Sequence, residues 1–110
     1  MNKFLRDAGF YQVESAKNAR WYQKEYELIG LFNAQIQHAF INIGQRVPHQ
    51  GKFYFTVKKF LDGKIIKYIL NLEDGQGRND GTQAITEYQI KSLLINWENS
   101  LRQYNIYEHN

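Results

Sequence analysis

The 110-residue chain contains no cysteine and a single proline, and it has no long hydrophobic run. Without cysteine, the chain can form no disulfide framework, no thiolate nucleophile and no cysteine-ligated zinc site. No stretch approaches the roughly 18 consecutive apolar residues of a membrane-spanning helix, and the N-terminus lacks the apolar run of a signal peptide. We therefore expect a cytoplasmic protein with no membrane partner.

Motifs for catalysis and for cofactor binding are also missing. The glycine-containing segment 74–81 has neither the ligand spacing of a calcium loop nor the Gly-Lys-Ser/Thr ending of a phosphate loop. A small RNase would need a histidine placed beside Arg46, Lys52 or Tyr54, and no fixed spacing supports that arrangement. The histidines, which also lack metal-ligand spacing, are His38, His49 and His109. We expect no enzyme, no metal and no cofactor.

The composition that is present fits one globular domain spanning residues 1–110. Hydrophobic residues make up 43% and charged residues 23% of the chain, close to the average for folded proteins. The net charge of +3 is uneven, because residues 44–72 are strongly basic while residues 73–110 are net acidic. The basic residues of the middle segment, opposed only by Asp62, are Arg46, Lys52, Lys58, Lys59, Lys64 and Lys67. Such a local positive field attracts anionic partners.

The clearest structural signal is a hairpin in this basic segment. Two runs rich in β-formers, 52–61 and 64–72, flank Asp62-Gly63, a dipeptide that suits a two-residue turn with positive φ. A turn at these two residues would place Lys58 opposite Lys67. One side of the hairpin would then be almost wholly apolar, with Phe53, Phe55, Val57, Ile66, Tyr68, Leu70 and Leu72.

A C-terminal helix is equally well marked. Residues 86–89, Thr-Glu-Tyr-Gln, form a capping box, which predicts an amphipathic helix over about 87–104. Its apolar stripe would pack on the apolar side of the hairpin, and it consists of Ile90, Leu93, Leu94, Trp97, Leu101 and Tyr104. Residues 2–8 are expected to form a short helix that ends at Gly9, and residues 82–85 a short strand.

The region from residue 10 to 44 is less determined. Residues 10–14 and 20–28 are enriched in aromatic and β-branched residues and are predicted as strands, although residues 16–32 also offer helix-like apolar spacing. Residues 35–43 are predicted as a strand. The fold class is therefore α+β, with the hairpin 52–61/64–72 central in an antiparallel sheet, the C-terminal helix on one face and a short N-terminal helix.

The side of the hairpin away from the helix is the candidate binding face. Lysines interleaved with aromatic rings suit single-stranded nucleic acid, because ammonium groups contact phosphates while rings stack on unpaired bases. The predicted binding residues are Tyr54, Lys58, Phe60, Lys67, Arg46, Lys52 and Arg78. A secondary candidate patch contains Arg20, Trp21 and Lys24. Alternatively, the N-terminal segment covers this face and makes it a second core layer.

Residues 52–101, and 81–93 in particular, resemble the positive-cofactor-four class of single-stranded DNA-binding domains. In both, a strand leads into a helix with an aromatic residue and a leucine near its start. The resemblance implies a homodimer whose sheets grip unpaired strands. The chain departs from the pattern, because residues 77–81 hold one basic and one acidic residue where that class has a lysine-rich loop, and residues 1–44 have no counterpart. We therefore do not assign the chain to this class.

The sequence favours a small nucleic-acid-binding protein, for single-stranded DNA or RNA more than for duplex. The alternative is a protein-binding inhibitor or immunity-type module, in the style of phage or mobile-element proteins, that acts through a tyrosine-rich surface; the chain has 8 tyrosines. Salt separates the two hypotheses, because affinity for nucleic acid falls steeply as the salt concentration rises.

Overall fold

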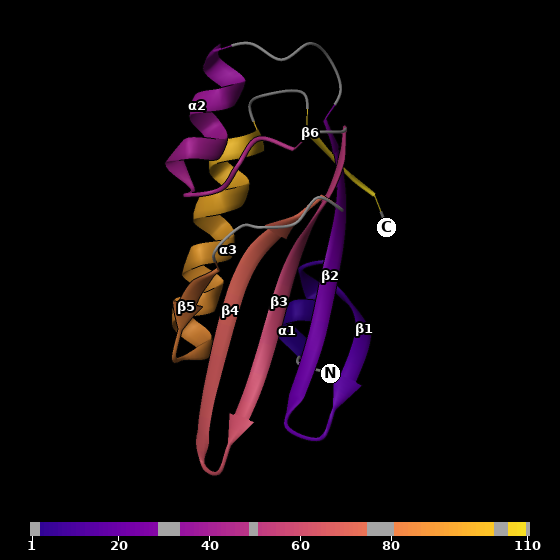
Figure 1. The fold of residues 1–110 in the computed structure, drawn as a ribbon, viewed down its shortest axis with the longest axis vertical. Coiled ribbons are helices and arrows are strands. Elements are labelled where there is room, and N and C mark those ends of the chain that lie inside the picture. Colours follow the sequence, from indigo (N-terminus) through magenta and orange to yellow (C-terminus); the bar gives the residue numbers. More distant parts are fainter. Residues whose placement is uncertain (1–2, 29–33, 49–50, 75–80, 103–105, 110) are drawn as a thin grey trace.

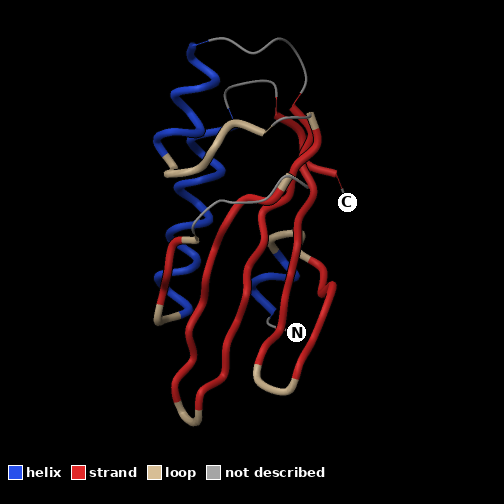
Figure 2. The backbone as a smooth tube through the Cα atoms, in the orientation of Figure 1, coloured by secondary structure: helices blue, strands red, loops and turns tan. Residues whose placement is uncertain are grey.

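Helices cover one side of an antiparallel sheet in the computed structural model, which describes residues 3–28, 34–48, 51–74, 81–102 and 106–109 (Figures 1 and 2). The strands follow one another across the sheet in the order β1-β2-β3-β4-β5, and β6 pairs with β2 beside β1. This arrangement is the expected α+β fold. In chain order the elements are α1 (Lys3–Asp7), β1 (Tyr11–Ala16), β2 (Ala19–Leu28), α2 (Ala34–Asn42), β3 (Lys52–Asp62), β4 (Ile65–Glu73), β5 (Thr82–Ala84), α3 (Glu87–Arg102) and β6 (Ile106–His109).

The hydrophobic core lies between the helices and one face of the sheet. The stripe on α3 is buried as expected at Ile90, Leu94, Trp97 and Leu101, and Trp97 stands edge-on to Phe55 with 5.4 Å between ring centroids. At the start of α3, the Gln89 amide donates to Thr86 Oγ1, while Gln89 Oε1 accepts from the Ile85 amide. The sheet side of the core includes Tyr22, Tyr26, Phe53, Phe55, Val57, Tyr68, Leu70 and Leu72.

The β3–β4 hairpin forms, but its predicted register is wrong. Asp62 pairs with Ile65, so the two turn residues are Gly63 and Lys64 rather than Asp62 and Gly63. Gly63 has a φ of +62°, which glycine adopts at the first turn position without a steric penalty. Lys58 consequently lies opposite Ile69, and Lys67 lies opposite Phe60, so the predicted Lys58–Lys67 pair does not exist. The shift moves each pair by two residues and leaves both faces of the hairpin unchanged.

The prediction of a strand over residues 35–43 is also wrong, because Ala34–Asn42 forms helix α2. Its buried residues Ile36, Ala39 and Phe40 share one helical face, a spacing that the apparent alternation of isoleucines concealed. Just beyond the end of the helix, Gly44 has a φ of +72°, and the Gln45 amide donates back to the Phe40 carbonyl.

The N-terminal half extends the sheet. The strand prediction for 10–14 and 20–28 is confirmed over the helical alternative, since β1 pairs with β2 and β2 pairs with β3. These strands therefore lie beside the hairpin and do not cover its second face. The expected short helix before Gly9 and the short strand near 82–85 are present as α1 and β5. Strand β6 had no sequence signal that we recognised.

Candidate nucleic-acid interface

One face of the sheet carries none of the described helices, and we call it the open face. Rows of paired residues cross it from β2 through β3 to β4, for example Trp21, Lys58 and Ile69. Rings, amides and charges alternate along these rows. The open face consists of Trp21, Gln23 and Glu25 on β2, of Tyr54, Thr56, Lys58 and Phe60 on β3, and of Lys67, Ile69, Asn71 and Glu73 on β4.

In the half of the open face farther from the hairpin turns, a carboxylate and an ammonium group neutralise each other. Tyr54 donates its hydroxyl hydrogen to Glu25 Oε1 over 3.1 Å, and Lys52 Nζ lies 3.4 Å from the same oxygen. Burial raises the pKa of Tyr54 above its ordinary value, and the hydrogen bond to Glu25 raises it further. Two predicted contacts, Tyr54 and Lys52, are thus already bonded to a carboxylate.

A second carboxylate, Glu73 at the end of β4, contacts side chains in the middle of the open face. The Gln23 side-chain amide donates to Glu73 Oε2 and to Thr56 Oγ1, each over 3.5 Å, and Asn71 donates to Glu73 Oε1 over 3.4 Å. Lys58 Nζ is 3.8 Å from Glu73 Oε1 and 5.5 Å from the centre of the Trp21 ring. Lys58 therefore has one anionic partner and one aromatic partner before any ligand binds.

The opposite half of the open face ends at two turns that lie side by side. The β1–β2 turn and the β3–β4 turn are at the same end of the sheet (Figure 1), and the Leu61 amide donates to the Asn18 carbonyl over 2.7 Å. This contact brings together two sequence segments, 16–20 and 58–67, which contain six basic residues and one acidic residue, Asp62, while Glu73 from outside them pairs with Lys58. We call these basic residues the tip cluster: Lys17, Arg20, Lys58, Lys59, Lys64 and Lys67.

A shallow groove of about 410 Å³ opens on this end of the sheet. Its walls are mostly apolar, with Asn18 and the tip-cluster residue Lys67 as polar members. Ile65 is 65% exposed, an unusual fraction for a large aliphatic side chain on a strand. The residues that line this tip groove are Asn18, Phe60, Leu61, Ile65, Lys67 and Ile69. Apolar walls beside clustered cations can hold a ligand that has both a flat apolar part and a negative charge.

The two patches that the sequence separated are partly one surface. Trp21 pairs with Lys58 on the open face, whereas Arg20 pairs with Lys59 on the opposite face, so Trp21 is the member of the secondary patch that joins the open face of the hairpin. The Arg20 guanidinium donates to the carbonyls of Ala16 and Ala19, which orders the β1–β2 turn. Phe60 and Lys67 face each other on the same end.

The remaining predicted residues lie elsewhere. Arg46 follows α2, which lies at the end of the molecule away from the two turns (Figure 1), and Lys52 begins β3 at that end. Arg78 lies outside the described residues.

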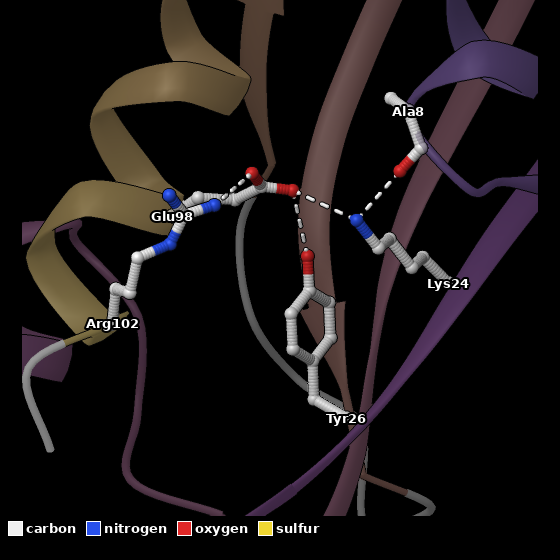
Figure 3. Close-up of polar contacts among 5 residues, drawn as sticks. All are labelled: Ala8, Lys24, Tyr26, Glu98 and Arg102. Atoms are coloured by element: carbon white, nitrogen blue, oxygen red, sulfur yellow. Dashed lines mark hydrogen bonds and ion pairs between the residues drawn. The ribbon is translucent and has the colours of Figure 1, made fainter. Parts of the chain in front are cut away.

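Lys24 of the secondary patch is buried in the core. Its ammonium group donates to the Ala8 carbonyl over 2.6 Å and forms an ion pair with Glu98 Oε1 over 3.1 Å (Figure 3). Tyr26 donates its hydroxyl hydrogen to the same oxygen over 2.9 Å, and Arg102 lies 3.4 Å from Glu98 Oε2. The inward alternation of Tyr22, Lys24 and Tyr26 along β2 is the sequence signal that could have found this site.

Within the part of the chain that the structure describes, no helix is long and apolar enough to cross a membrane, and no cluster of three potential metal ligands occurs. No protein-family model matches the chain, and no curated protein or solved structure shows significant similarity to it.

Proposed function

We propose that this protein binds single-stranded nucleic acid at the turn end of its open face, without catalysis. The observation that carries the proposal is the convergence of two hairpin turns whose segments hold Lys17, Lys64 and Lys67. The other basic residues of these segments are Lys58, which is already paired with Glu73, and Arg20 and Lys59, which lie on the opposite face of the sheet. Half-buried Trp21 and Phe60 lie on the same end of the face. Cations that contact phosphates, next to rings that stack on bases, are the two components of sequence-tolerant single-strand binding.

The remainder of the open face does not support a longer track of phosphate contacts. Lys52 and Lys58 are paired with Glu25 and Glu73, so a strand that followed the whole face would pass two carboxylates. The proposed contact is therefore short and confined to the turn end of the open face, beyond Lys58. Short sites give modest affinity with strong salt dependence, because few phosphates are neutralised and stacking supplies the rest.

The test compares the turn end of the open face with positions outside it, at equal change of charge. Fluorescence anisotropy of labelled single-stranded DNA and RNA is measured between about 50 and 200 mM salt, where phosphate contacts dominate the change in affinity. The double variant Lys64→Gln/Lys67→Gln should lower the slope of log affinity against log salt by about 1.4, from about 0.7 for each lost single-strand phosphate contact.

The matched control is Lys52→Gln/Lys91→Gln, which removes the same charge from residues that lie away from the turns. Its slope should equal that of the wild type. A control that loses as much slope as the tip variant would refute a localised site, and undetectable oligonucleotide binding at low salt would refute the function.

A different surface supports the alternative of a protein-binding module. Tyr88 is 78% exposed on α3, and Ile85 and Ile95 beside it are also exposed. Tyr88 lines a groove of about 340 Å³ together with Gln83, Gln89, Ser92, Leu93 and Asn96. Exposed apolar side chains around a polar groove are typical of protein contacts. If a defined protein partner is found, Tyr88→Ala should weaken its binding while Lys64→Gln/Lys67→Gln should not.

A further inference from the structure

We infer that the tip groove holds one unpaired adenine base, so that binding depends on base identity as well as on phosphate charge. The inference rests on the proposed function and adds a base contact to it. The groove volume of about 410 Å³ lies within the range of about 300–1,000 Å³ typical of small-molecule sites.

The shape and chemistry of the groove favour a base over other anionic ligands. Phe60 offers an aromatic ring, and Ile65 and Ile69 offer apolar surfaces in the same groove. Unpaired bases stack on aromatic rings and contact apolar side chains of this kind, because the base presents a flat ring to them. An acidic peptide would use the cations of the tip cluster, but it has no planar group that needs such walls.

The polar members of the groove can read the base and hold its phosphate. Asn18 is exposed, and its backbone carbonyl is held by the Leu61 amide, which fixes the residue at the groove edge. An asparagine amide carries both donors and an acceptor, a pattern that matches the N6 amino group and N7 of adenine. Lys67 lies in the groove, and Lys64 lies in the β3–β4 turn next to the groove residue Ile65. These two lysines provide positive charge for the phosphate that flanks the base.

The test uses the wild-type protein first, so that no variant needs to fold. Four labelled oligothymidylate probes are compared at one salt concentration: all thymine, one central adenine, one central abasic site, and one central 7-deazaadenine. The adenine probe should bind at least about fivefold more tightly than the abasic probe, because stacking of one base is lost. The 7-deazaadenine probe, which lacks the N7 acceptor, should fall between the two.

Variants then assign the contacts. Asn18→Ala should abolish the difference between adenine and 7-deazaadenine while leaving the salt slope unchanged, and Asn42→Ala, an exposed asparagine at the end of α2, is the matched control. Phe60→Leu should reduce the difference between the adenine and abasic probes. Thermal melting of each variant separates loss of binding from loss of fold.

The outcomes distinguish the inference from the function on which it rests. Equal affinity for all four probes, with steep salt dependence, would overturn the base contact and leave single-strand binding intact. No binding of any probe at low salt would overturn both. Competition by polyglutamate as effective as that by the adenine probe would overturn the base contact, because the site would then respond to negative charge alone.

Discussion

The buried ion pair between Lys24 and Glu98 gives the sharpest test of how this fold is held together. Only 5% of the Lys24 side chain and 19% of the Glu98 side chain are exposed. Glu98→Gln would remove the carboxylate with which the buried ammonium group forms its ion pair. Breaking a buried pair in this way costs about 3–5 kcal/mol, a large share of the roughly 5–15 kcal/mol that stabilises a domain.

The opposite substitution should cost less, and this asymmetry follows from the geometry. After Lys24→Met, the Glu98 carboxylate keeps the Tyr26 hydroxyl as a donor, retains Arg102 nearby and is partly reached by water. The main loss is then the hydrogen bond to the Ala8 carbonyl and the pairing itself, about 1–3 kcal/mol. The double variant should be less destabilised than the sum of the two single variants, because neither charge is left alone.

The assay is urea denaturation of the wild type, both single variants and the double variant. Glu87→Gln is the matched control, because Glu87 and Lys91 form an exposed pair four residues apart on the same helix, and its loss should cost at most about 0.5 kcal/mol. The reasoning is refuted if Glu98→Gln destabilises the protein no more than Glu87→Gln does, since the pair in the core would then behave like one in water.

Three further predictions test other parts of the structure. Trp97→Ala should destabilise the fold by about 3–5 kcal/mol in the same urea assay, because it empties the contact with Phe55. Gly63→Val should lower the melting temperature more than Gly63→Asn, since a Cβ there meets no neighbour and only the positive φ penalises valine. The raised Tyr54 pKa favours the neutral phenol in the folded state, so the wild type should lose stability relative to Tyr54→Phe as pH rises from 10.0 through the folded pKa, as followed by denaturation at each pH.

The parts of the fold that could be predicted are those that short-range patterns determine. Helix α3 has a capping box and an apolar stripe whose spacing fits the helical period, and both signals come from residues close in sequence. The faces of the β3–β4 hairpin were predicted correctly although its register was not, because a shift of two residues preserves the alternation. Helix α2 was missed because its nine residues support both an alternating and a helical interpretation, and its burial against the core selects the helix.

The candidate site was harder to predict because its charges are set by strands that are far apart in sequence. The sequence predicted a basic middle segment, yet pairing brings Glu25 next to Tyr54 and places Glu73 close to Lys58, so that Lys52 and Lys58, two of the six basic residues, have carboxylate partners. No pattern within residues 44–72 contains these carboxylates. Composition over a segment therefore overestimates the field that a ligand meets on a folded sheet.

The same long-range pairing explains why positive charge persists at the turn end. Within each hairpin, the residues nearest the turn pair with residues close in sequence, so the composition of the two turn segments largely determines the charge at that end of the sheet. Segments 16–20 and 58–67 are each rich in basic residues, and the hydrogen bond between Leu61 and Asn18 holds the two segments next to each other. Toward the opposite end, each strand meets partners from distant segments, and Glu25 and Glu73 are among them. The position of the turns thus determines where basic residues lie farthest from Glu25 and Glu73, and for this reason we propose the site at the tip groove and not at the centre of the open face.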